Sequence, residues 1–183
     1  MATWTFDPSH LQVEFSAKHL GMMTVRGHFS EVTASGQIDP HNPATSAVAV
    51  DIKTASIKTN NEQRDSDLRG SNFLEIDKYP TITFKSTRIE PAGPDQYTMT
   101  GDLTIKGTTK PVTLKVTRYG EITDARMGHR MAYSAEGEIN RKDFGLTMNM
   151  LVDGRWMVGD EVKIAIELEL VEQKEEALAG AST

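Results

Sequence analysis

The chain has 183 residues and no Cys, so it can bury a core without disulfides and offers no thiolate nucleophile or Cys-ligated metal. Its formal net charge of -6 argues against a general nucleic-acid-binding protein, which needs a basic face. The opening MATWTFDPSH has no basic segment followed by an apolar run, and no stretch approaches roughly 20 apolar residues. We therefore expect no signal peptide, no membrane span and a cytoplasmic location.

Eight segments alternate between apolar and polar residues, which is the period of a half-buried strand. In chain order they cover residues 11–19, 22–29, 46–53, 81–86, 96–106, 111–116, 130–139 and 161–170. The opposite phase is mostly Thr, Lys, Glu, Ser and Arg, as suits a solvated surface. We predict an all-β fold of eight antiparallel strands with one dry and one wet face.

One segment, TNNEQRDSDLRGSNFL, breaks the alternation and predicts a short helix at about residues 60–70. Asn60 or Asn61 is a suitable N-terminal cap, Leu68 lies on the buried side, and Phe73 packs back onto the sheet. A single short helix among long strands indicates a lid on a barrel.

The end of the chain, EQKEEALAGAST, combines carboxylates with small residues. We predict a single domain over residues 1–171 and a frayed or weakly helical tail over residues 172–183. A partner-binding tail is the alternative.

Eight antiparallel strands form either a two-sheet sandwich or a barrel. Closure removes the exposed edges, and an eight-stranded barrel can hold one small ligand. Small residues recur in the inward phase of several strands: Ala17, Gly27, Ser86, Gly101, Ala135 and Gly137. Together they predict room inside the barrel, whereas each glycine taken alone could mark a bulge or a bend.

The candidate ligand-binding residues follow from strand phase and from the predicted helix, and most of them are large and apolar. They are Val13, Phe15, Ala17, His19, Val25, Phe29, Val50, Ile52, Arg64, Leu68, Phe73, Ile82, Phe84, Met99, Leu103, Ile105, Leu114, Met131, Tyr133, Ile164 and Ile166.

Three histidines, His10, His19 and His28, recur at intervals of nine. His19 falls on the inward phase and His28 on the outward phase, and no Asp or Glu completes an obvious ligand set. We expect no metal and no cofactor. His19 is either a polar anchor near a barrel mouth or a residue bonded to neighbouring backbone.

Charged residues cluster in two further places. In EQRDSDLR, Arg64 and Asp65 either pin the lid helix or let Arg64 donate to a carbonyl oxygen of a ligand. In INRKDFGL, Arg141 and Asp143 suggest a structural turn, with Gly145 at the bend. The chain lacks the nucleophile elbow and the glycine-rich nucleotide loops, so we expect no enzyme.

Several blocks occur in an order that resembles the YceI-like family of polyisoprenoid-binding proteins over residues 3–171. They are WTFDPSHLQVEFSAKHLGMMTVRGHF, TNNEQRDSDLRGSNFLEIDKYPTITFKS, GDLTIKGTTKPVTLKV, INRKDFGL and DEVKIAIELEL. The resemblance implies a lipocalin-like eight-stranded barrel with a long apolar tunnel for an isoprenoid chain, such as a quinone tail, or for a fatty amide. We expect no leader of the kind that the family's secreted members carry, so their periplasmic location does not carry over, and family members can be homodimers.

Three functions stay open. The first is a protein that binds, carries or sequesters an isoprenoid or other long-chain lipid. The second is an enzyme that acts on an isoprenoid-type substrate inside the tunnel. The third is a structural barrel whose own side chains fill the cavity.

Overall fold

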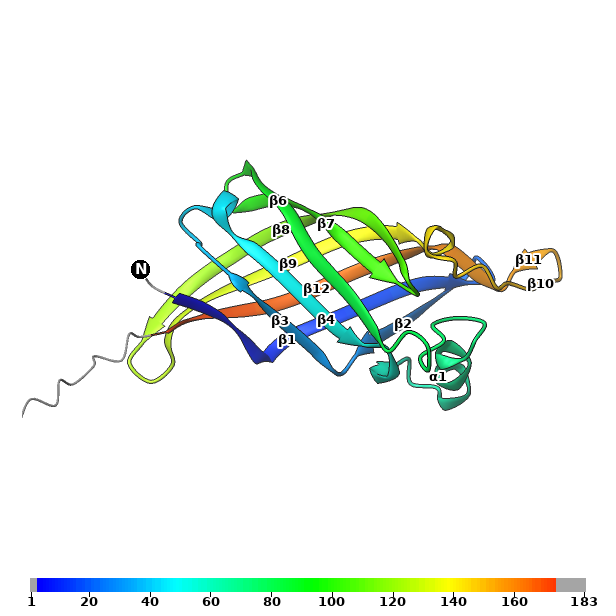
Figure 1. The fold of residues 1–183 in the computed structure, drawn as a ribbon. Helices are drawn as coiled ribbons and strands as arrows, with labels where there is room; N and C mark the ends of the chain where they lie inside the picture. The colour runs from blue at the N-terminus through cyan, green and yellow to red at the C-terminus, as the bar shows by residue number, and fades with distance from the viewer. Residues whose placement is uncertain (1–2, 174–183) are drawn as a thin grey trace, which may run out of the picture.

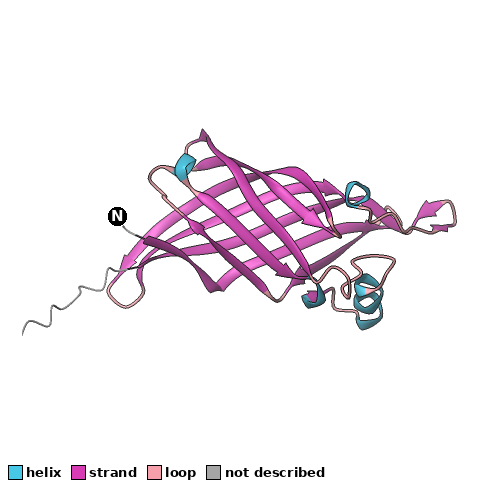
Figure 2. Cartoon of the chain, in the orientation of Figure 1, coloured by secondary structure: helices cyan, strands magenta, loops and turns pink. Residues whose placement is uncertain are grey.

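The computed structural model describes residues 3–173, which form an all-β protein with one short α-helix (Figures 1 and 2). One antiparallel sheet contains β1 (Thr3–His19), β2 (Met23–Phe29), β3 (Val32–Gln37), β4 (Ala47–Lys53), β5 (Ile57–Lys58), β6 (Thr81–Gly93), β7 (Gln96–Ile105), β8 (Thr108–Asp124), β9 (Gly128–Asn140) and β12 (Val158–Gln173). A separate hairpin joins β10 (Leu151–Val152) to β11 (Arg155–Trp156). The helices are α1 (Glu62–Arg69) and the 3-10 turns Pro43–Thr45, Thr54–Ser56 and Arg141–Phe144.

The sheet runs in the order β3-β4-β6-β7-β8-β9-β12-β1-β2-β5. β2 pairs with β1 near one end of this order, and β3 pairs with β4 at the other end. Only Ser30 and Glu31 separate β2 from β3, so one bent stretch of chain connects both ends of the sheet. The sheet therefore curls around on itself, as the strands in Figure 1 show, and the predicted lipocalin-like all-β fold is confirmed.

The number of strands differs from the prediction because residues 32–37 form a strand that the sequence pattern does not indicate. The segment VTASGQ has a single large apolar residue, so it carries no apolar alternation. When β2 and β3 are counted as one bent strand and the two-residue β5 is set aside, eight strands form the wall.

The first and last strands are longer than predicted. β1 starts at Thr3, and its register with β12 shifts between Phe6 and Leu11. β12 continues to Gln173, so Glu172 and Gln173 of the predicted tail belong to a strand. The rest of that tail lies outside the described residues. Within residues 3–173, no helix has the length and apolar character needed to cross a membrane.

Buried side chains form two groups. The larger group fills the barrel interior and includes Phe84, Leu103, Ile105 and Leu114. The smaller group, Trp4, Met131 and Leu170 with partly buried Phe6, Ile38, Tyr133 and Leu168, lies near the N-terminal end of β1. Figure 1 places that end opposite α1, so the small apolar group lies at one end of the barrel and α1 at the other.

Three inward glycines do not leave open space, which corrects the prediction made from their size. A Cβ atom on each would collide with a large side chain of a neighbouring strand. The contacts are 2.4 Å to Phe15 Cζ at Gly27, 2.4 Å to Phe84 Cζ at Gly101 and 2.6 Å to Leu114 Cδ2 at Gly137. Gly27 and Gly101 thus make room for an aromatic ring of a neighbouring strand, as in aromatic rescue of strand glycines, and Gly137 makes room for Leu114.

Candidate functional site

A cavity of about 240 Å³ runs inside the barrel and receives side chains from strands all around the wall and from the α1 region. Its lining comprises Phe6, Leu11, Val13, Glu14, Phe15, Ala17, Phe29, Ala34, Val48, Val50, Ile52, Ile57, Leu68, Phe73, Leu74, Ile82, Phe84, Met99, Leu103, Ile105, Val112, Leu114, Ala135, Ile139, Arg141, Leu146, Val158, Val162, Ile164, Ile166 and Leu168. All of these residues except Glu14 and Arg141 are apolar. Such a surface favours an apolar occupant and leaves a polar one without partners.

The cavity is long and narrow. Along β1 its lining extends from Phe6 to Ala17, which is eleven residue steps. The bulge between Phe6 and Leu11 takes up several of these steps, because the paired stretch of β12, from Val162 to Leu170, is only eight steps long. At roughly 3.3 Å per residue and a strand tilt of roughly 40°, eight steps correspond to a tunnel of about 20 Å. A volume of about 240 Å³ spread over that length suits a thin chain better than a compact molecule.

Most of the candidate ligand-binding residues lie in this tunnel. They are Val13, Phe15, Ala17, Phe29, Val50, Ile52, Leu68, Phe73, Ile82, Phe84, Met99, Leu103, Ile105, Leu114, Ile164 and Ile166. Strand phase places all of them except Leu68 and Phe73 there, because alternate residues of each strand share one face. Their contact with a ligand stays a prediction.

Five candidates lie elsewhere. Met131 belongs to the small group around Trp4, and Tyr133 packs against both groups. Burial raises the pKa of Tyr133 to about 12. Val25 is half-buried opposite Ala17, outside the lining. His19 Nδ1 lies 3.1 Å from the carbonyl oxygen of Met157, which matches the backbone-bonded alternative.

The fifth candidate, Arg64, helps to fasten α1 to the wall. Its Nε donates to Thr59 Oγ1 at 2.8 Å and its Nη2 donates to the Thr59 carbonyl oxygen at 2.7 Å. Asp65, which is buried, accepts from the Thr59 amide at 2.9 Å, and Asn61 caps the helix by accepting from the Arg64 amide at 2.9 Å. These bonds hold Leu68 over the tunnel, so the charges of the helix serve its attachment.

Arg141 is a tunnel residue that the sequence interpretation assigned only to a turn. Its side chain is buried, and its guanidinium donates to the carbonyl oxygens of Gly159 at 2.9 Å, Leu146 at 2.5 Å, Met148 at 3.0 Å and Val158 at 3.3 Å. Burial lowers the pKa of Arg141, and the carboxylate of Asp160 partly opposes that shift. The guanidinium therefore ties the segment after β9 to the start of β12 at one end of the tunnel.

The turn around Arg141 otherwise matches the prediction. Asn140 Oδ1 accepts from the Lys142 amide at 2.9 Å. Gly145 ends the turn with φ of 74°, a conformation that favours glycine. The ion pair of Arg141 is with Asp160, at 3.5 Å, rather than with Asp143.

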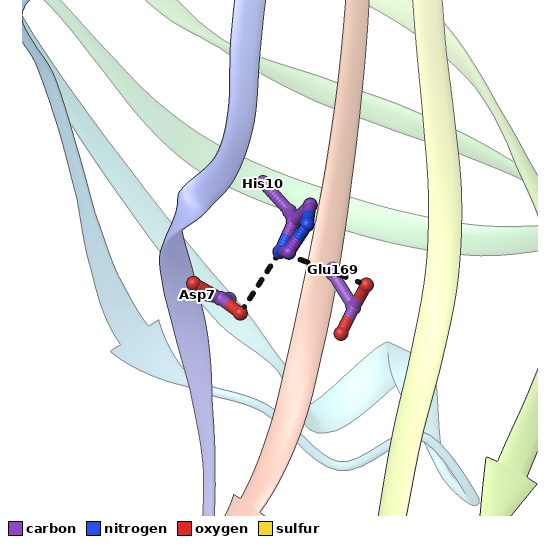
Figure 3. Close-up of side chains that lie close together, drawn as sticks. All are labelled: Asp7, His10 and Glu169. Atoms are coloured by element: carbon purple, nitrogen blue, oxygen red, sulfur yellow. Dashed lines mark hydrogen bonds and ion pairs between the residues drawn. The ribbon is translucent and has the colours of Figure 1, made fainter. Parts of the chain in front are cut away.

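The structure brings His10 together with two carboxylates that sequence reasoning did not connect to it. Figure 3 shows His10 between Asp7 and Glu169, and their ligand atoms lie within 4.8 Å of one another. Arg130 Nη1 also lies 2.7 Å from Asp7 Oδ2 and pairs with Glu169. The guanidinium forms ion pairs with both carboxylates, so we interpret the group as an ion-pair network on the outer wall.

A second ion-pair network lies nearby around His129. Its Nδ1 is 2.8 Å from Glu172 Oε2 and its Nε2 is 2.9 Å from Glu121 Oε2. Hydrogen bonds to Glu121 and then to Glu172 raise the pKa of His129, despite partial burial. The imidazole ring also packs edge-on against Trp4, with ring centroids 4.8 Å apart.

Several lining residues were absent from the sequence-based candidates. Ala34 belongs to the unpredicted strand β3, and Phe6 lies in the unpredicted first part of β1. Leu146 is in a loop, where periodicity carries no information. The alternation of Trp4 and Phe6 with Thr was the available signal for the start of β1.

The fold and the tunnel define a class: a lipocalin-like barrel with an apolar cavity. The YceI-like domain matches residues 4–170, so the chain belongs to the YceI-like family. It is 39% identical over 165 residues to the protein YceI of Shigella flexneri, covering 90% of this chain and 83% of the relative.

Two solved structures share this architecture. BcnA of Burkholderia cenocepacia superposes with a TM-score of 0.79 at 27% identity, over 90% of this chain and 98% of BcnA. A polyisoprenoid-binding domain of Saccharophagus degradans, implicated in plant cell wall breakdown, has a TM-score of 0.64 at 14% identity. That superposition covers 94% of this chain and all of the domain, and at this identity it shows the fold alone.

Proposed function

We propose that this protein binds a long, thin apolar chain, and that the natural ligand is a polyisoprenoid such as the tail of an isoprenoid quinone. The observation that carries the proposal is the tunnel itself, which is about 20 Å long and lined by apolar side chains apart from Glu14 and Arg141. Burial of apolar surface contributes roughly 25 cal/mol per Å², so a chain enclosed along this length gains substantial affinity without any polar contact.

The length of the tunnel favours an isoprenoid over a single fatty chain. The hydrocarbon core of a bilayer is roughly 30 Å thick, so one acyl chain of one leaflet spans roughly half of that. A chain that fills the whole tunnel, at about 20 Å, is about a third longer. A fatty amide would fill part of the same space, and the domain described as polyisoprenoid-binding supports the longer ligand.

The polar end of the tunnel selects weakly among head groups. The donors of Arg141 are engaged by backbone carbonyls, so the guanidinium contributes little to a ligand oxygen. One methylene changes binding by only about 1 kcal/mol. We therefore expect several bound chains of similar width, carried or sequestered without chemical change. The compartment that we propose is the cytoplasm.

Mass spectrometry of an organic extract from the purified protein tests this proposal, with a denatured and washed sample as the control. An isoprenoid in stoichiometric amount supports the proposal. A fatty amide in stoichiometric amount would show that the natural ligand is the shorter chain. A bound lipid that turns into product during incubation would point to an enzyme. An empty extract from a stable, folded protein would favour a barrel filled by its own side chains.

A matched pair of variants on β9 separates the tunnel from the fold. Ala135 lines the tunnel, whereas Ala132 on the same strand is exposed on the outer surface. Ala135→Phe should occupy the tunnel and remove most of the extracted lipid, while Ala132→Phe should leave the lipid unchanged. Equal lipid in both folded variants would contradict the proposed site.

A further inference from the structure

The largest group of exposed apolar side chains lies at one end of the barrel. The β10–β11 hairpin exposes 57% of Leu151, 60% of Trp156 and, just before β10, 54% of Met150. The turn between β1 and β2 exposes Met22 and Met23 to a similar extent. Figure 1 shows the hairpin projecting beyond the wall at the end opposite the N-terminus.

The hairpin and the turn form one surface, which we call the apolar tip: residues 20–23 and 150–157. The Leu20 amide donates to the Met157 carbonyl oxygen at 3.2 Å, and the side chain of Arg155 reaches to about 4.0 Å from the Cβ position of Gly21. The tip adjoins the end of the tunnel, because Val158 lines the tunnel and follows Met157 directly.

A cationic groove lies on the outer wall beside the apolar tip. Lys163 of β12 and Arg26 of β2 both pair with Ser16 of β1, so the side chains of these two cations share the outer face. Lys58 of β5 completes the groove, whose lining contains a single carboxylate, that of Glu14.

Charge in this groove has the opposite sign to the charge of the chain. The chain carries a formal net charge of -6, yet Arg26, Lys58 and Lys163 are exposed and make no salt bridge within residues 3–173. The acidic side chain of Glu138, opposite Lys163 on β9, marks the border of the groove. Three residue steps along β1 and one beyond its end separate Ser16 from Leu20, at most roughly 13 Å, so the groove and the tip can meet one surface together.

We propose that the apolar tip and the cationic groove form a docking surface for an anionic lipid bilayer. Trp156 and the neighbouring Met and Leu side chains enter the interfacial region, where Trp is enriched. The cations of the groove then face anionic head groups, at about 1 kcal/mol for each Lys or Arg near the surface. Docking in this pose presents the Val158 end of the tunnel to the membrane.

A second copy of the chain fits this surface less well. A stable protein interface needs about 800 Å² per partner, and a narrow projecting hairpin presents little flat area for it. The other exposed apolar group, Tyr119, Ile122 and Met127, has flanking charges of both signs, from Arg118, Glu121, Asp124 and Arg126, so it lacks a cationic surface to match an anionic membrane. That group supplies a control at the other end of the barrel.

Vesicle flotation with the full chain tests the proposal without any added isoprenoid, so its result does not depend on the proposed ligand. The wild-type protein should float with vesicles of phosphatidylcholine and phosphatidylglycerol and bind phosphatidylcholine alone far more weakly. Trp156→Ala should weaken partitioning about tenfold, whereas Tyr119→Ala should leave it unchanged. Arg26→Gln should weaken it about fivefold, and Lys115→Gln, on the opposite wall, should have no effect.

Several results would overturn the inference. They are no flotation of the wild-type protein, equal flotation of Trp156→Ala and Tyr119→Ala, or binding that ignores phosphatidylglycerol. Sedimentation velocity on the same samples tests whether the tip binds a second copy of the chain. A wild-type dimer that becomes a monomer in Trp156→Ala, with unchanged flotation, would assign the tip to self-association. Circular dichroism spectra that match the wild-type protein show that each variant is folded.

Discussion

Gly101 should be among the least replaceable residues of the barrel wall. A Cβ atom at this position would lie 2.4 Å from Phe84 Cζ and 2.5 Å from the Lys85 carbonyl oxygen. The Phe84 ring can rotate away only into the tunnel, and the carbonyl belongs to a strand that is paired on both sides. We therefore expect Gly101→Ala to cost roughly 3 kcal/mol of unfolding free energy, the upper part of the range for overpacking.

Urea unfolding followed by circular dichroism measures this cost. With a slope of roughly 2 kcal/mol per M, the midpoint should fall by roughly 1.5 M. Gly159→Ala is the control, because its Cβ would lie 3.3 Å from its nearest neighbours and its φ needs no glycine. We expect a change below about 1 kcal/mol there.

A double-mutant cycle identifies the cause. Phe84→Leu removes the ring and leaves the Lys85 carbonyl, so in that background Gly101→Ala should cost about half as much. The Gly101→Ala protein should also retain less lipid, because the displaced ring narrows the tunnel. If Gly101→Ala lowers the free energy of unfolding no more than Gly159→Ala does, or if Phe84→Leu does not reduce the cost of Gly101→Ala, our explanation of the glycines by packing is wrong.

Three further predictions concern polar residues. Arg141→Met should lower stability by roughly 3 kcal/mol in urea, because buried carbonyls lose their donor, while unchanged stability would show that water replaces it. Glu121 and Glu172 raise the pKa of His129 in the folded protein. The protonated imidazole therefore adds to the free energy of unfolding, in full below about pH 6.5, and this contribution is lost as pH rises through the folded-state pKa. The urea midpoint of the wild-type protein should fall as pH rises across that range, whereas the midpoint of His129→Gln should not. An identical fall in both proteins would show that the imidazole is not its cause. Asn61→Ala should lower the free energy of unfolding by about 1 kcal/mol, because α1 loses its cap. It should also speed lipid release, measured by transfer to vesicles, and release at the wild-type rate would show that α1 does not control the exit of the lipid.

The strand segments and the inward phase of most tunnel residues were accessible from the sequence. Val13, Phe84 and Ile164 face the tunnel because a period of two assigns alternate residues to one face of any strand. The helix over Glu62–Arg69 was equally readable, since a cap and a break in alternation are local signals. Strand β3 was not, because its small and polar residues give no periodic signal.

Inward phase alone did not distinguish the residues that line the tunnel from those that fill it. Met131 and Tyr133 point inward but pack with Trp4 at one end of the barrel. Gly27 and Gly101 also point inward, yet rings from neighbouring strands occupy the space above them. These outcomes depend on which strands are neighbours and in which register, information that no short stretch of sequence contains.

The sequence by itself determined the all-β class, the phase of the long strands and the lid helix, because each depends on residues close together in the chain. The tertiary structure decided the connection of β2 to β3 across the sheet, the burial of Arg141 among backbone carbonyls and the course of the tunnel. It also decided the meeting of Leu20 with Met157 in the apolar tip. Each of these joins segments that are remote in sequence or pair with different neighbours, so only closure of the barrel brings them together.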